Sequence, residues 1–166
     1  MNPTQALGLP RLQEGLQRLE PLLTDAVVTG DSFLDEVTTH LIAAGGKRLR
    51  PLLSLATATA GERDATHEDL MGGVAVELVH LASLYHDDVI DEATIRRNVE
   101  SVNSRYGNLV AIVAGDYLLA HPAEVGAQAD QHGGRHAFAL ADEPEQHVLG
   151  ADVAVPELQR LTQRQL

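Results

Sequence analysis

An apolar stretch that ends in a cluster of acids, residues 70–92, constrains the fold of this chain more than any other feature. Thr66, followed three residues later by Asp69, resembles a capping box and marks the start of a helix. The apolar residues that follow lie on nearly every face of that helix: Val74, Val76, Leu78, Val79, Leu81, Leu84, Val89 and Ile90. Since such a helix must be packed on most sides, we expect it at the centre of the fold.

The acids HDDVIDE, residues 86–92, close this central helix. Asp87 and Asp91 are four residues apart and therefore share one helix face, whereas Asp88 lies on an adjacent face. Acids this close together repel one another and resist burial. A hard divalent cation removes the repulsion, and Mg²⁺ typically takes only one or two protein carboxylates, with phosphate oxygens completing its shell. The pattern favours a magnesium site over the alternative, a solvated acidic helix face.

The other patterns before residue 121 are also helical, because apolar residues recur every three to four positions. We expect helices over four further ranges: 12–27, which Pro21 interrupts; 31–44, which Gly45 and Gly46 end; 51–60; and 108–120. These patterns predict an all-α fold.

Two cationic clusters accompany the acidic one. Lys47, Arg48 and Arg50 directly follow two glycines, and Arg96 and Arg97 follow the acids. Each cluster alone is equally well explained as ordinary surface charge. Together with the acidic helix, they suggest a diphosphate held by a metal on one side and by guanidinium groups on the other.

Composition excludes several classes of function. The chain has 24 acidic and 12 basic residues, a formal charge of −12, which argues against binding to nucleic acid or to an anionic membrane surface. It has no cysteine, which excludes disulfides, thiolate zinc sites and cysteine nucleophiles. We see no secretory leader and no apolar run of the ~18 residues that a membrane span needs, so we expect a cytoplasmic protein.

Three segments, GGKRLRPLL, ELVHLASLYHDDVIDEATIRRN and NLVAIVAGDYLLA, together resemble the N-terminal half of a trans-polyprenyl diphosphate synthase. The likeness covers roughly residues 30–120, and HDDVID carries the family's first aspartate-rich motif, DDxxD. It implies the helical isoprenoid-synthase bundle and a Mg²⁺-dependent prenyl transfer. In that reaction an allylic prenyl diphosphate loses its diphosphate, and isopentenyl diphosphate attacks the resulting cation.

The resemblance also implies roles for single residues. Asp87 and Asp91 match magnesium ligands, and Asp88 between them completes the catalytic acids. Isopentenyl diphosphate is bound by the residues that match Lys47, Arg50 and His80, with Arg97 as a further contact, and the allylic diphosphate by the residue that matches Arg96. By itself, His80 reads more simply as a core histidine. Asn98 stands where the family usually has Gly, at a position that mainly shapes a loop.

Ala82 and Ser83 lie one turn before Asp87, and the resemblance puts them beside the path of the growing prenyl tail. Short-chain members of the family carry bulky aromatic residues there. Because both residues are small here, we expect a long product, of geranylgeranyl length or beyond.

The second half of the family is not recognisable in this sequence. It has no second DDxxD motif, and its only lysine, Lys47, already belongs to the first cationic cluster. We therefore expect a truncated, partial polyprenyl synthetase domain over residues 1–120. We expect residues 121–166 to form an irregular, unrecognised tail, which a frameshift, a fusion junction or disorder would explain.

Other functions stay open at this point. The chain is alternatively a non-catalytic relic, or a subunit that acts as a homodimer or in association with a full-length synthase. A magnesium-dependent terpene cyclase also carries DDxxD on the same fold. The GGKRLRP segment disfavours a cyclase, because cyclases do not bind isopentenyl diphosphate.

Overall fold

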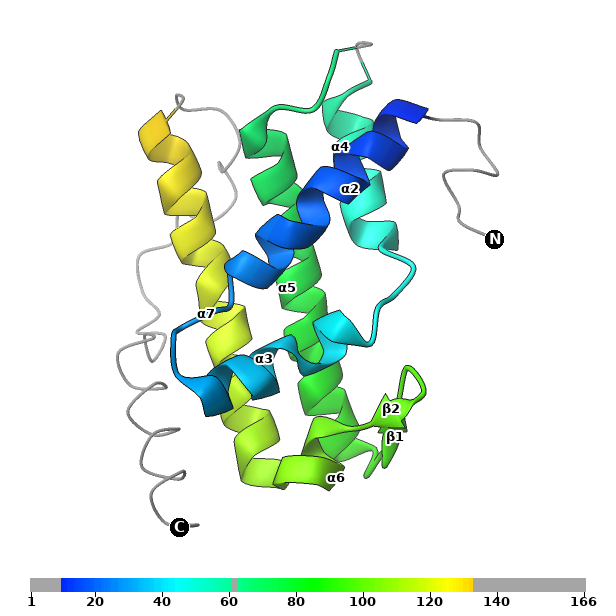
Figure 1. Ribbon diagram of the computed structural model, residues 1–166, viewed down its shortest axis with the longest axis vertical. Helices are drawn as coiled ribbons and strands as arrows, with labels where there is room; N and C mark the ends of the chain where they lie inside the picture. The colour runs from blue at the N-terminus through cyan, green and yellow to red at the C-terminus, as the bar shows by residue number, and fades with distance from the viewer. Residues whose placement is uncertain (1–9, 61–62, 133–166) are drawn as a thin grey trace.

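The computed structural model describes residues 10–60 and 63–132, and in it the other helices surround α5 (Figure 1). In chain order the elements are α2 (Pro10–Asp25), α3 (Ser32–Ala43), α4 (Leu49–Ala58), α5 (His67–Ile90), β1 (Ile95–Arg96), β2 (Val99–Glu100), α6 (Val102–Tyr106) and α7 (Asn108–His132). The prediction of an all-α fold is confirmed, with one short antiparallel hairpin as the exception in the described ranges. Among these residues, no helix is both long and apolar enough to cross a membrane.

The start of α5 is the capping box that the sequence predicted. The Thr66 side chain accepts a hydrogen bond from the backbone N–H of Asp69, and the Asp69 carboxylate accepts one from the backbone N–H of Thr66 at 2.8 Å. Arg63 also donates to this carboxylate, and this hydrogen bond lowers the pKa of Asp69 to about 2. The box fixes where the central helix begins.

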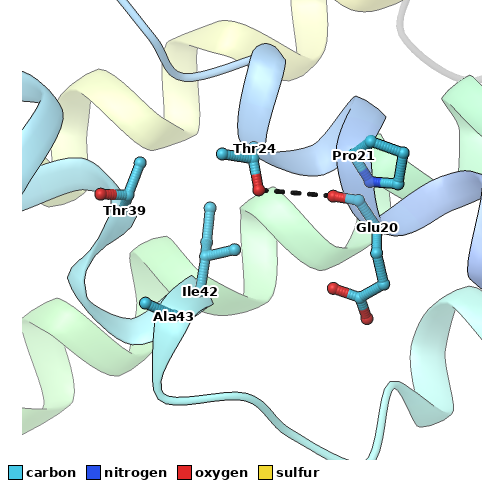
Figure 2. A pocket seen from close by; sticks show the side chains of 6 residues that line it. All are labelled: Glu20, Pro21, Thr24, Thr39, Ile42 and Ala43. Carbon is cyan, nitrogen blue, oxygen red and sulfur yellow. Dashed lines mark hydrogen bonds between the residues drawn. The ribbon is translucent and has the colours of Figure 1, made fainter.

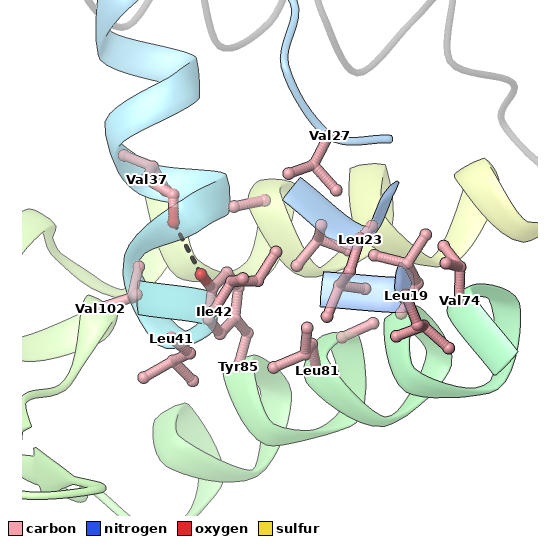
Figure 3. Close-up of a cluster of buried hydrophobic side chains, with 14 of the residues drawn as sticks. Leu19, Leu23, Val27, Val37, Leu41, Ile42, Val74, Leu81, Tyr85 and Val102 are labelled. Carbon is pink, nitrogen blue, oxygen red and sulfur yellow. Dashed lines mark hydrogen bonds between the residues drawn. The ribbon is translucent and has the colours of Figure 1, made fainter. Parts of the chain in front are cut away.

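Small residues let the neighbouring helices approach α5 closely. A Cβ added at Gly73 would lie 2.5 Å from a methyl carbon of Leu19, on the helix α2 that crosses α5. A Cβ added at Gly115 of α7 would lie 2.4 Å from the ring of His86. Tyr85 fills the space below α3, where its hydroxyl donates to the backbone oxygen of Val37 at 2.7 Å (Figure 3).

Two helices continue through a proline that the sequence suggests would interrupt or end them. α2 is a single helix although Pro21 lies inside it, because the fully buried Leu19 and Leu23 hold both sides of the proline against the core. α7 was expected to end near Ala120, but it continues through Pro122 to His132. The backbone therefore has no break at the boundary expected near residue 121, and residues 133–166 of the expected tail lie outside the described residues.

The hairpin was not expected from the sequence. Ile95 pairs with Glu100 and Arg96 with Val99, and the two residues between the strands, Arg97 and Asn98, have positive φ angles of 52° and 65°. Two consecutive left-handed residues are typical of the tight turns that match the twist of a hairpin. Asparagine tolerates this conformation better than most residues do, which explains how it stands in a place suited to glycine.

We predict that Asn98→Gly leaves stability unchanged or raises it, whereas Asn98→Val lowers the free energy of unfolding by about 1–2 kcal/mol, since a β-branched residue resists a left-handed backbone. Urea unfolding followed by circular dichroism measures both variants. A valine variant as stable as the parent chain would contradict this description of the turn.

Candidate functional site

The C-terminal end of α5 carries acids where helix electrostatics oppose them. The helix ends at Ile90, Asp91 is its C-cap residue, and the last turn contains no basic residue. The carbonyl groups at this end carry a partial negative charge, so each carboxylate here is destabilising unless a cation compensates it. A sequence that breaks a local rule in this way is typical of a functional site.

Asp88 is compensated within the protein. Its side chain is 1% exposed, and its Oδ1 accepts a hydrogen bond of 2.7 Å from Nε of Arg96, whose Nη2 also contacts it. The amide of Asn103 donates to the backbone oxygen of Asp88 at 3.1 Å. Asp88 thus fastens β1 and α6 to the end of α5, and its place among the catalytic acids stays a prediction.

Asp87 and Asp91 are exposed at the helix end, on a face adjacent to that of the buried Asp88. No hydrogen bond or ion pair joins either carboxylate to another side chain in the described ranges. The separation of this pair from Asp88 agrees with the helix faces predicted from the spacing. Of the three aspartates, Asp87 and Asp91 are therefore the two whose carboxylates form no hydrogen bond or ion pair in the described part of the chain, although Arg96 lies within electrostatic reach of both.

The donor set fits a hard cation that has further ligands outside the chain. No group of three or more His, Cys, Asp or Glu side chains that could hold a metal occurs within residues 10–60 and 63–132. Two carboxylates are nevertheless the usual protein contribution to a Mg²⁺ ion that also binds phosphate. In addition, Oδ2 of Asp88 is buried and has no hydrogen-bond partner among the described residues.

The first cationic cluster divides into a buried and an exposed part. Arg48 is buried: its Nε donates to Glu20 at 2.7 Å and its Nη1 to Glu77 at 2.9 Å. Burial lowers the pKa of Arg48, but the hydrogen bonds and charges of both carboxylates outweigh this effect and raise it overall. Lys47 and Arg50 are exposed on either side. Arg48 therefore secures the loop, and its neighbours are the residues available to a ligand.

Arg97 is engaged with the end of α3. Its guanidinium donates to the backbone oxygens of Leu41, at 2.9 Å, and Gly45, and lies 3.8 Å from Glu77. A Cβ at Gly46 would lie 3.1 Å from the guanidinium carbon, so this glycine makes room for the contact. Burial and the charge of Arg48 lower the pKa of Arg97. Sequence reasoning missed these contacts, although one signal was present: Glu77 is a lone acid in an apolar helix.

His80 links the cationic loop to the acidic helix end. The ring is half-buried, and burial, followed by the positive charges of Arg50 and Arg97, lowers the pKa of His80, while Asp87 opposes the shift. These residues come from three separate segments of the chain, so the fold brings Arg50 and Arg97 within electrostatic reach of His80. The excess positive charge around the ring favours an anionic ligand.

The structure separates the two residues expected beside the prenyl tail. Consecutive residues on a helix point about 100° apart. Ser83 is exposed on the face that carries Asp87, where its hydroxyl donates to the backbone oxygen of His80 at 2.8 Å. Ala82 is 1% exposed and belongs to the hydrophobic core. Ser83 therefore shares the exposed face of Asp87, whereas Ala82 packs inward; the role of both residues beside the prenyl tail stays a prediction.

An exposed apolar surface extends beyond the acids, and we call it the open face. It consists of large side chains on the neighbouring helices α5 and α7: Val76, Val79, Ile90, Leu109, Ile112 and Leu119. His86 joins the two helices at this surface, where its Nε2 lies 3.3 Å from both the backbone oxygen of Ile112 and a carboxylate oxygen of Asp116. Exposed apolar groups that gather in this way mark a surface that contacts another molecule or another part of a larger one.

A separate cavity of about 430 Å³ lies between α2 and α3 (Figure 2). Its lining residues are Glu20, Pro21, Thr24, Thr39, Ile42 and Ala43. The one ionisable group among them, Glu20, is already paired with Arg48. The cavity therefore offers no uncommitted charged group for chemistry.

Comparison with known proteins supports the reading of the motifs. The family model for polyprenyl synthetase matches residues 31–150. Nonaprenyl diphosphate synthase of Mycobacterium tuberculosis is 43% identical over 109 residues, which are 66% of this chain and 32% of that protein. Heptaprenyl diphosphate synthase component 2 of Geobacillus stearothermophilus is 41% identical over 113 residues, 68% of this chain and 35% of that protein.

A solved structure extends the likeness to the fold. The crystal structure of polyprenyl synthase from Caulobacter crescentus, complexed with calcium and isoprenyl diphosphate, matches with a TM-score of 0.66 at 32% identity. The match covers 72% of this chain and 37% of that one. The chain spans about a third of the length of the curated relatives named above. The resemblance in the motifs is therefore confirmed, and the chain belongs to the polyprenyl synthetase family.

Proposed function

We propose that this chain carries one side of the active site of a polyprenyl diphosphate synthase, which condenses isopentenyl diphosphate with an allylic diphosphate. The observation that carries the proposal is the exposed pair Asp87 and Asp91 at the negative end of α5, whose carboxylates form no hydrogen bond or ion pair in the described part of the chain. Arg96 lies within electrostatic reach of this pair, and His80 lies within reach of both Asp87 and Arg50. A bound diphosphate with its metal would balance both sets of charges.

Asp87 and Asp91 are the proposed magnesium ligands. When bound there, Mg²⁺ would supply charge neutralisation for the departing diphosphate. The carboxylates offer the hard oxygens that this ion prefers and lack a protein partner in the described ranges, so binding a cation would remove their repulsion. The charge of Arg96 interacts with both of them, which orients the hairpin beside the diphosphate that departs.

Lys47, Arg50 and His80 are proposed to hold the diphosphate of isopentenyl diphosphate. Lys47 and Arg50 are exposed, and Arg50 is close enough to His80 to affect its charge. These residues would fix the nucleophilic substrate, and the reaction requires no protein nucleophile. Apolar side chains of the open face would exclude water from the allylic cation. The proposal includes a cytoplasmic location, where the charged substrates are dissolved.

The product is proposed to be long. Ser83 is the small residue on the face shared with Asp87, and it leaves room for a growing prenyl chain along α5. Ser83→Phe would close this path, whereas an aromatic ring at Ala82 would overpack the core instead.

The second candidate function is that of a chain that does not act alone, as a subunit or a relic. The open face favours it, because an isolated catalytic domain would cover the apolar groups that line its reaction chamber. One named relative is a component 2, so a synthase made of components occurs among the proteins similar to this chain.

Incorporation of labelled isopentenyl diphosphate into prenyl product tests both candidates. We expect little product from the chain alone. We expect more product when a synthase that lacks its first DDxxD motif is added, because each protein then supplies the motif that the other lacks. Product from the chain alone would support an autonomous enzyme. If neither the chain alone nor the mixture gives product, the chain has no part in catalysis, and the remaining candidate is a non-catalytic relic.

The two parts of the acidic cluster should respond differently to substitution. Asp87→Asn should weaken Mg²⁺-dependent binding of isopentenyl diphosphate without changing thermal stability, because this side chain is exposed. Asp88→Asn should lower the free energy of unfolding by about 3 kcal/mol, since it leaves Arg96 without its buried partner. Calorimetric titration and thermal unfolding measure the two effects. The reverse order would mean that the assignment of the helix faces is wrong.

The pKa of His80 should report the anion. Burial and two nearby arginines lower the pKa of His80 in the free chain, so an anion that neutralises those arginines should raise it. Proton uptake should therefore accompany binding of isopentenyl diphosphate, and affinity should rise as the pH falls towards the raised pKa. NMR titration of the histidine ring, with and without the ligand, measures the shift in the pKa of His80. The Lys47→Ala variant, whose anion site is weakened, serves as the comparison. An unchanged pKa in the presence of saturating ligand would remove His80 from the site.

A further inference from the structure

Glu77 lies in the middle of α5, 2% exposed, and far from the acidic end of the helix. A buried carboxylate is strongly unfavourable unless charged groups or hydrogen bonds compensate it. Here the compensation comes from two arginines. Nη1 of Arg48 donates to Oε1 of Glu77 at 2.9 Å, and Nη2 of Arg97 lies 3.8 Å from the same oxygen. One carboxylate oxygen therefore accepts a hydrogen bond from one loop and forms an ion pair with a second loop, far from the first in sequence.

The two arginines also share an unusual backbone conformation. Arg48 has a φ of 47° and Arg97 a φ of 52°, in the left-handed region that residues with a Cβ seldom adopt. Such conformations persist only where surrounding contacts hold them. Each arginine directly adjoins a residue assigned to the diphosphates: Lys47 precedes the first and Arg96 precedes the second.

We propose that Glu77 is a positioning residue that locks both cation-bearing loops to α5, and thereby sets the separation between the two diphosphate subsites. Its carboxylate touches neither substrate. It holds Arg48 and Arg97 in place, and they hold the backbone from which Lys47 and Arg96 extend. The diphosphates in this statement rest on the proposed function, whereas the locking of the two loops does not.

Glu20 supplies the matched control. It binds the same Arg48, at 2.7 Å and 3.1 Å, but within the described residues no hydrogen bond or ion pair joins it to Arg97. Glu20→Gln should therefore loosen only the first loop, and Glu77→Gln, which keeps the size of the side chain and removes its charge, should loosen both.

Amide hydrogen exchange measured on peptides covering residues 45–52 and 94–101 tests this. We expect exchange to become roughly tenfold faster in both peptides for Glu77→Gln, and in the first peptide alone for Glu20→Gln. Unchanged exchange at 94–101 in Glu77→Gln would overturn the proposal. Should Glu77→Gln fail to fold, Glu77→Asp replaces it, because the shorter side chain withdraws the carboxylate towards the backbone of α5. This variant must show the same loss of exchange protection in both peptides. Retained protection in both peptides would overturn the proposal equally.

Calorimetric binding of isopentenyl diphosphate with Mg²⁺ tests the consequence for the site. If the parent chain binds, Glu77→Gln should bind at least about tenfold more weakly, because small misplacements of binding groups are costly. Arg97→Lys keeps the charge but loses the forked guanidinium, so its affinity should lie between those of the parent chain and Glu77→Gln. Equal affinity in Glu77→Gln and the parent chain would overturn the positioning role. Absence of binding in the parent chain would instead contradict the proposed function, and the exchange experiment would still decide whether Glu77 locks the loops.

Discussion

One helix has to satisfy two opposing requirements, and the rest of the structure depends on how it does so. α5 is apolar enough to be packed by α2, α4 and α7, yet it ends in carboxylates that its own dipole disfavours. The apolar middle fixes the helix in place, and the strict capping box fixes where it starts. With both the start and the packing set, the position of the acids follows from the length of the helix.

The hydrogen bonds around α5 convert this rigid axis into a site. Asp88 holds the hairpin, and Glu77 holds the loop before α4 through Arg48. Both acids face inward, so the residues that remain exposed, Asp87 and Asp91, differ from them only in their place on the helix surface. Burial thus divides these four carboxylates into two that hold loops to the helix and two that stay exposed to a ligand.

Sequence reasoning identified the features that depend only on the local pattern of residues along the chain. The capping box of Thr66, the shared face of Asp87 and Asp91, and the helices themselves follow from spacing along the chain. It did not identify the partners of Arg48, because Glu20 and Glu77 lie 28 and 29 residues away and their approach is a product of helix packing. It did not separate the buried Ala82 from the exposed Ser83, because which residue of a turn packs inward depends on the neighbouring helices. It ended α7 too early, because a single proline and a change in composition are weaker signals than the packing of a long helix.

The open face has a consequence for how the protein behaves in concentrated solution. Its apolar side chains attract other copies, whereas a formal charge of −12 keeps copies apart. Added salt screens the repulsion between charges that lie further apart than a Debye length, about 8 Å at physiological ionic strength, but leaves the apolar attraction intact. Self-association through this face is therefore favoured by salt, the opposite of the behaviour of a complex that ion pairs hold together. Colloidal stability in this chain is a property of its acidic surface as a whole, and the same acids that prepare it for a cation keep it dispersed.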